Sequence, residues 1–188
     1  MWRRFALPGA LAVTSVVGCG GGKDATPSPP CDQACVDGVT LRAVRETLKL
    51  AYNLTLQGNA VGPQEGASPC PGGGSVRVVG EASSNATQGA TRVDLTFTFS
   101  ACAYQRTSGE PDKSYDVILD GVVREQGTLA VQPTATTALL LSSDELEVRG
   151  QVYDPPLAIA PGACALTASQ SGNDVTGTLC GRPARFSF

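Results

Sequence analysis

Seven cysteines are the residues of this chain whose type and spacing most directly indicate chemistry. They are Cys19, Cys31, Cys35, Cys70, Cys102, Cys164 and Cys180. No pair has the Cys-x-x-Cys spacing of redox or haem sites, and a zinc site needs more closely spaced pairs than this chain has. In an exported protein such cysteines are oxidised in pairs, so disulfides are the expected chemistry. The odd total leaves one cysteine that needs a separate explanation.

Catalytic residues are harder to find, because the sequence contains no histidine, the commonest general base and metal ligand. A serine nucleophile would then need a lysine, but the adjacent Lys113 and Ser114 point to opposite faces of an extended strand; a spatial dyad from elsewhere in the fold stays open. Neighbouring carboxylates occur as Asp116 with Asp120, and as Asp144, Glu145 and Glu147. A solvated sheet edge explains them. We expect no enzyme activity, no metal site and no cofactor.

The N-terminus has the layout of a secretory signal. Arg3 and Arg4 precede a largely apolar run from Phe5 to Val17. A helix of this length rises about 20 Å, which is too short for the roughly 30 Å hydrocarbon layer of a membrane. Residues 1–18 are therefore expected to be a signal peptide rather than a membrane-spanning helix.

The segment Val16-Val17-Gly18-Cys19 resembles the lipobox of bacterial lipoproteins, in which a small residue precedes a cysteine that becomes the new N-terminus. The resemblance implies cleavage before Cys19, a diacylglyceryl thioether on its sulfur and usually acylation of its amine. Several acyl chains anchor a protein stably to a membrane. In this family an Asp after the cysteine retains the protein at the inner membrane. Gly20 stands there instead, so we expect a lipid-anchored protein of the cell envelope, at the outer rather than the inner membrane.

Residues 19–36 are expected to hold the lipidated Cys19 and a flexible tether, because the tract Gly20–Pro30 is rich in glycine and proline and cannot build a core. With Cys19 assigned to lipid, six cysteines remain, an even number that predicts three disulfides. Cys164 and Cys180 flank a turn at 171–174, Cys70 precedes a strand and Cys102 ends the next, and Cys31 and Cys35 have i,i+4 spacing at a helix start. We expect the pairs Cys31–Cys35, Cys70–Cys102 and Cys164–Cys180, although six cysteines allow 15 pairings.

Residues 37–188 are expected to form a single disulfide-stapled domain that begins with one helix. Asp37 can cap a helix over residues 38–57. Its apolar stripe, at helical spacing, consists of Leu41, Val44, Leu48, Ala51 and Tyr52. Residues 58–74 are rich in proline and glycine and are expected to form a loop pinned by Cys70.

From residue 75 to 188 the hydrophobic period is two, which predicts strands. It is clearest in 92–100, where Val93, Leu95, Phe97 and Phe99 face one side. Further strands are expected at 76–81, 114–119, 127–132, 136–141, 145–153, 164–169, 175–180 and 184–188. No helical pattern lies between them, so parallel βαβ units are excluded. The expected fold is mainly β: an antiparallel β-meander that forms a sandwich or barrel, with one N-terminal amphipathic helix packed on it.

The segments Cys70–Gly74, Leu95–Cys102 and Val175–Gly181 are similar to those of a group of uncharacterised bacterial lipoproteins in which cysteines punctuate repeated strands. The resemblance covers about residues 70–181. It implies no particular activity.

Composition narrows the function classes. The net charge of −3 argues against a nucleic-acid partner, and 41% hydrophobic residues argue against disorder. The expected function is that of a lipid-anchored cell-envelope protein of unknown biochemical activity, a structural or interaction module that contacts the membrane through Cys19 and has an unidentified protein or small-molecule partner. The alternative is a β-barrel that binds an apolar small molecule, and a hydrolase using acids alone ranks last. An apolar cavity of several hundred Å³ would favour the barrel, whereas a filled interior would favour the first function.

Overall fold

The computed structural model describes residues 31–85, 90–130, 137–159 and 162–188. Within them one helix, α1 (Gln33–Leu56), precedes nine strands and a short 3₁₀ helix, η1 (Pro111–Lys113). The strands are β1 (Gly62–Pro69), β2 (Ser75–Asn85), β3 (Ala90–Arg106), β4 (Tyr115–Ala130), β5 (Ala138–Val152), β6 (Leu157–Ile159), β7 (Cys164–Ser171), β8 (Asp174–Leu179) and β9 (Arg182–Ser187). The predicted signal peptide, Cys19 and most of the tether lie outside the described residues.

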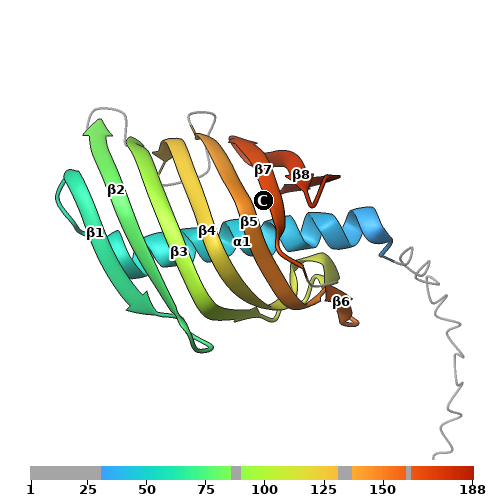
Figure 1. The fold of residues 1–188 in the computed structure, drawn as a ribbon. Helices are drawn as coiled ribbons and strands as arrows, with labels where there is room; N and C mark the ends of the chain where they lie inside the picture. The colour runs from blue at the N-terminus through green and yellow to red at the C-terminus, as the bar shows by residue number, and fades with distance from the viewer. Residues whose placement is uncertain (1–30, 86–89, 131–136, 160–161) are drawn as a thin grey trace, which may run out of the picture. The chain divides into compact units, whose positions relative to one another are not determined.

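The strands form one antiparallel sheet that follows the chain almost without interruption. Its order is β1-β2-β3-β4-β5-β7-β8-β9, and β6 pairs with β5. The described strands leave β1 and β9 as the two ends of this order, so the sheet is not closed into a barrel. The predicted mainly β meander is confirmed in its sandwich-like form, with α1 as the second layer (Figure 1).

Helix α1 supplies that second layer by crossing the strands on one face of the sheet (Figure 1). Every residue from Asp37 to Leu48 is buried except Glu46. Leu41, Val44 and Leu48 are fully buried, in one hydrophobic cluster with the inward-facing strand residues. A Cβ atom at Gly38 would lie 2.7 Å from the carbonyl oxygen of Arg185, so the helix approaches β9 closely at this glycine. Residues 37–48 of the helix are thus enclosed on almost all sides rather than laid on the sheet by a single stripe.

The other face of the sheet faces water, as the alternating pattern predicts. In β3, Val93, Leu95, Phe97 and Phe99 are buried, whereas Asp94 and Thr98 between them are exposed. Half-buried strands of this kind are typical of antiparallel sheets with one solvated face.

The structure also corrects several predicted boundaries. The helix begins at Gln33, and its N-cap is Asp32, whose carboxylate accepts a hydrogen bond of 2.9 Å from the backbone N–H of Cys35. The predicted cap at Asp37 is therefore wrong, since Asp37 lies inside the helix. Residues 62–69, predicted as loop, form β1 because they pair along their whole length with β2.

Two long strands were each predicted as two short ones. Strand β4 contains residues 115–119 and 127–130 of the segments predicted at 114–119 and 127–132, and β5 contains residues 138–141 and 145–152 of those predicted at 136–141 and 145–153; residues 131, 132 and 136 lie outside the described residues. Both strands continue because each pairs with neighbouring strands on both sides. The pairing between β4 and β5 resumes after a register shift between Gly121 and Arg124. A bulge of this kind interrupts the local alternation without ending the strand.

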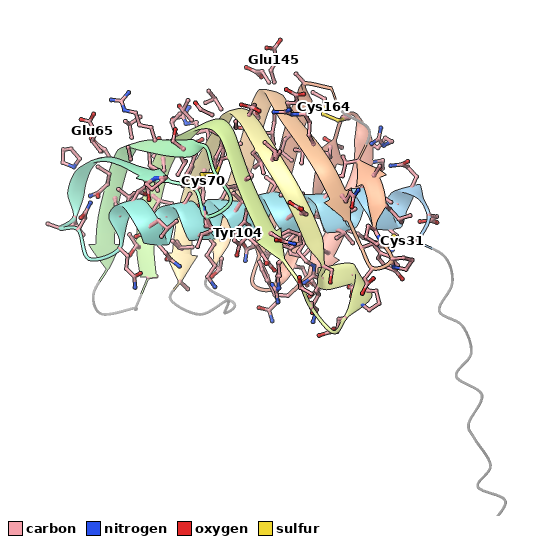
Figure 2. All side chains as sticks on the ribbon, turned by 90° about the horizontal axis from the view of Figure 1, so that it is seen from below. Cys31, Glu65, Cys70, Tyr104, Glu145 and Cys164 are labelled. Carbon is pink, nitrogen blue, oxygen red and sulfur yellow. A yellow bond between two sulfur atoms is a disulfide. The ribbon has the colours of Figure 1, made fainter. Side chains whose placement is uncertain are left out.

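Three disulfides join the same pairs that the spacing predicts. The Cα–Cα distances are 5.2 Å for Cys31–Cys35, 5.4 Å for Cys70–Cys102 and 5.0 Å for Cys164–Cys180. The first spans the start of α1, the second connects the β1–β2 turn to β3, and the third connects β7 to the end of β8; the sulfur atoms at Cys70 and Cys164 are visible in Figure 2. The bridges therefore fix the helix start and two hairpins of the sheet.

Candidate functional site

The lysine and serine considered for nucleophilic catalysis do not form a dyad with each other. The Nζ atom of Lys113 lies 2.8 Å from Glu110 Oε1. The hydroxyl of Ser114 accepts a hydrogen bond of 3.0 Å from the backbone N–H of Ser108. Both side chains are thus engaged in local contacts that order the segment around η1.

The neighbouring carboxylates predicted on strands lie on the solvated face of the sheet. Asp116 is exposed, and Glu145 projects away from the body of the protein (Figure 2). Asp120 accepts a hydrogen bond of 2.6 Å from the backbone N–H of Ala101 and lies 2.5 Å from the guanidinium of Arg149. The backbone hydrogen bond from Ala101, with a further contribution from Arg149, lowers the pKa of Asp120. A carboxyl held ionised in this way is unsuited to act as a general acid.

The remaining acidic residues of this group do not assemble a site either. Glu147 Oε1 lies 3.3 Å from Arg149 Nε, and Asp144 is exposed. Throughout the described ranges, no three aspartate, glutamate or cysteine side chains gather as a metal ion would require.

One carboxylate that was not predicted as a site residue, Glu125, lies on the face of the sheet that packs against α1. In β4, Val117, Leu119 and Val123 are buried, and the same alternation places Glu125 among them. The residues paired with it are Leu95 on β3 and Leu141 on β5, both fully buried. The signal was present in the sequence, since extending the alternation of 115–119 through Val123 predicts an inward Glu125.

Glu125 lines a cavity of about 340 Å³ between α1 and the strands, here called the Glu125 pocket. The other residues that line it are Arg45, Lys49, Tyr52, Asn53, Gln57, Thr91, Leu129 and Ala130. Arg45, Lys49 and Asn53 follow one another at i,i+4 spacing, so they form one stripe of the helix. Arg45, at one end of this stripe, and Glu125 on β4 are buried, whereas Lys49, Asn53 and Gln57 are exposed. The pocket therefore leads from the surface to a buried pair of opposite charges.

This buried pair has an incomplete set of hydrogen bonds. The side chains of Arg45 and Glu125 are only 3% and 2% exposed, yet Arg45 Nη1 lies 3.7 Å from Glu125 Oε2, beyond hydrogen-bond distance. Arg45 Nε donates a hydrogen bond of 2.7 Å to the side-chain oxygen of Gln170. Among the described atoms, Glu125 Oε2 has no hydrogen-bond partner. A buried polar group left without a partner costs about 1–3 kcal/mol, so this arrangement calls for an explanation.

The pocket also shifts the ionisation of its residues. Burial raises the pKa of Glu125, and the charge of Arg45 only partly opposes this effect. Burial, with a contribution from the negative charge of Glu125, raises the pKa of Tyr52 as well. Glu125 is therefore a group that can accept a hydrogen bond when ionised and donate one when protonated.

A second inward carboxylate, Glu46, shows what a completed arrangement looks like. It accepts a hydrogen bond of 2.6 Å from Arg106 Nη1 at one oxygen and a hydrogen bond from the Tyr115 hydroxyl at the other. Burial, together with the hydrogen bond to Glu46, raises the pKa of Tyr115. Glu46 therefore joins α1 to β3 and β4 as a structural contact, and the Glu125 pocket is the candidate functional site.

The comparisons with known proteins give no further identification: no protein-family model, no curated protein and no solved structure matches the chain.

Proposed function

We propose that this protein is a lipid-anchored component of a bacterial cell envelope, in which acyl chains on Cys19 hold a disulfide-stapled β domain at the membrane. The domain serves as a structural or interaction module. The observation that carries the proposal is the pairing of the cysteines. Six of the seven form three disulfides, and the one not among them is Cys19, which directly follows the lipobox-like Val16–Gly18.

The stapled domain supports this role in a second way. Disulfides form and persist in oxidising compartments such as the periplasm and the cell surface. The disulfide nearest the proposed anchor, Cys31–Cys35, spans the start of α1, so the first helical turn is covalently fixed. Residues 33–36, which were expected to belong to the tether, are helical instead. Among the described residues, no helix is long and apolar enough to cross a membrane.

The alternative, a barrel that binds an apolar small molecule, requires a closed sheet, whereas the described sheet ends at β1 and β9 and is open. The face of the sheet that would enclose such a ligand packs against Leu41, Val44 and Leu48 of α1. The cavity beside α1 is lined by charged and polar residues such as Arg45 and Glu125 as well as by apolar ones. An apolar ligand would gain little there, since burying a charge without a partner is unfavourable.

Lipidation is tested by expressing the full chain in a bacterium with labelled palmitate. We expect the label in the parent chain and none in Cys19→Ser. Cys31→Ser is the matched control, because it also removes one thiol but leaves the lipobox unchanged, and it should keep the label. Label retained by Cys19→Ser, or a parent protein whose intact mass corresponds to an unmodified N-terminus, would refute the proposal.

The choice of membrane is tested with a second variant. Because Gly20 stands where the lipoprotein family places the inner-membrane signal Asp, we propose the outer membrane. The parent chain should sediment with outer-membrane fractions on a density gradient, and Gly20→Asp should move it to inner-membrane fractions. A parent chain found in the inner membrane would contradict this part of the proposal.

A further inference from the structure

The Glu125 pocket has a property that anchoring does not explain. Its buried end contains an acceptor, Glu125 Oε2, without a hydrogen-bond partner among the described atoms. The same side chain is 2% exposed and lines a cavity of about 340 Å³. A cavity of this size lies within the lower range of small-molecule sites, which combine apolar walls with a few convergent polar groups.

The charges in the pocket follow a definite order. Arg45 Nη1 lies 3.7 Å from Glu125 Oε2 at the buried end, and Lys49, one helical turn further along α1, lines the pocket closer to solvent. An acidic group therefore lies beside one basic group and within the same cavity as a second. A ligand that satisfies both kinds of group must carry a hydrogen-bond donor for Glu125 and an acidic group for the two cations.

The position of Arg45 is fixed rather than adjustable. Its Nε atom donates to the side chain of Gln170 on β7, and the Nε2 atom of Gln170 donates a hydrogen bond of 2.8 Å to the carbonyl oxygen of Gly172. Gln170 is itself 3% exposed. The guanidinium is thus oriented by a chain of two hydrogen bonds, one buried and one part-buried, which is how binding sites hold their polar groups ready for a ligand.

The remaining walls of the Glu125 pocket are suited to an uncharged part of a ligand. Leu129 and Ala130 contribute apolar surface from β4, and Tyr52 contributes its ring from α1. Tyr52, Leu129 and Ala130 are each half-buried, so they lie between the buried charges and the exposed end of the pocket.

We propose that the Glu125 pocket binds a small zwitterion of the α-amino acid type, with its ammonium group on Glu125 and its carboxylate on Arg45 and Lys49. The neighbouring ammonium and carboxylate of such a molecule match the adjacent opposite charges at the buried end. The substituent then extends along Tyr52 and Leu129. This inference is independent of lipidation, because it depends only on residues of the described domain.

The test is calorimetric titration of the purified, oxidised full chain with each of the common L-α-amino acids. For any that binds, two analogues follow: the corresponding acid without the ammonium group and the corresponding amine without the carboxylate. For leucine these are 4-methylpentanoate and 3-methylbutylamine. We expect at least one amino acid to bind and both of its analogues to bind at least roughly tenfold more weakly, because each loses a charge-assisted hydrogen bond.

Variants locate the binding. Glu125→Gln should weaken it by roughly tenfold or more, and Glu145→Gln, an exposed glutamate on the solvated face, is the matched control that should leave it unchanged. Lys49→Gln, at an exposed position where folding is not at risk, should weaken binding by several-fold, and Lys113→Gln should not.

Three results would overturn the inference. If none of the amino acids binds, the pocket is only hydrated. If the acid alone binds as tightly as the zwitterion, the site is an anion site formed by Arg45 and Lys49. If the amine alone does so, it is a cation site at Glu125.

Discussion

Two buried carboxylates meet arginines beside α1, and they differ in almost every respect. Asp37 lies near the start of the helix, and both of its oxygens accept hydrogen bonds of 2.8 Å from Arg182 on β9. Gln33 donates a further hydrogen bond of 2.9 Å. Glu125 lies on β4, and Arg45 of the helix stays 3.7 Å away from it. One pair is complete, whereas the other opens onto a cavity.

The pKa values of the two groups follow this difference. The hydrogen bonds from Arg182 lower the pKa of Asp37 despite its burial, whereas burial raises the pKa of Glu125 despite the charge of Arg45. At Asp37 the protein supplies all the hydrogen bonds that the ionised group needs, so the pair acts as a structural link between α1 and β9. At Glu125 the described residues supply fewer than the group needs, which is typical of positions where a ligand completes the set.

The largest change in stability is expected from a substitution in the buried part of α1, which positions both pairs. Leu41→Ala removes a fully buried side chain and should lower the free energy of unfolding by about 3 kcal/mol, measured by urea denaturation with the disulfides intact. Leu54 is 47% exposed on the same helix, and Leu54→Ala should change the free energy of unfolding by no more than about 0.5 kcal/mol. Equal effects of the two variants would mean that α1 is not the core of the domain.

The next largest change in stability is expected from a substitution that disrupts the Asp37–Arg182 pair. Asp37→Asn removes the charge and one of the acceptors and should lower the free energy of unfolding by about 2 kcal/mol, in the range for hydrogen bonds to charged groups. The loss should not be greater, because Arg182 is 48% exposed and its charge returns to water. Asp116→Asn, at an exposed position on β4, is the control and should stay within about 0.5 kcal/mol of the parent. A loss no larger than the control's would show that the Asp37 pair does not stabilise the fold.

The sequence predicts the parts of this fold that local signals determine. The turn at 171–174 places Cys164 opposite Cys180, and the alternation in 92–100 identifies the inward face of β3. Local signals also mislead where two choices are chemically equivalent. Asp32 and Asp37 are both good caps, and the choice of Asp32 leaves Asp37 for its contact with Arg182, which lies 145 residues away in the sequence.

The candidate site was not predictable in the same way. Arg45 and Arg42 look like solvent-facing residues of an amphipathic helix, but Arg45 donates to Gln170 and Arg42 donates to the carbonyl oxygen of Ser187. Only the closure of distant strands over the helix buries them. Glu125 could have been found, because it continues an alternating pattern, but the break assumed between residues 119 and 127 hid it.

The smallest expected effect is a difference between Glu125 and Asp37 in how stability depends on pH. Because folding raises the pKa of Glu125 above its ordinary value of 4.5, the stability contributed by its protonated form is present below pH 4.5 and is lost as pH rises through the higher folded pKa. Asp37 behaves in the opposite way, since its contribution is present above its ordinary pKa of 3.8 and is lost as pH falls through the lower folded value. The other ionisable residues that line the pocket are Arg45, Lys49 and Tyr52, while the strands beside Glu125 contribute Leu95 and Leu141.

Glu125→Gln keeps the size of the side chain and removes its titration. Since burial outweighs the attraction of Arg45, the stability of the variant relative to the parent should rise by up to about 1 kcal/mol as pH increases from 4.5 to neutral. For Asp37→Asn the difference from the parent should instead shrink only below pH 3.8. Urea denaturation of both variants across this pH range distinguishes the pairs. A Glu125→Gln variant whose stability relative to the parent instead falls as pH rises would mean that Arg45 already satisfies Glu125, and the pocket would then have no unmet group to offer a ligand.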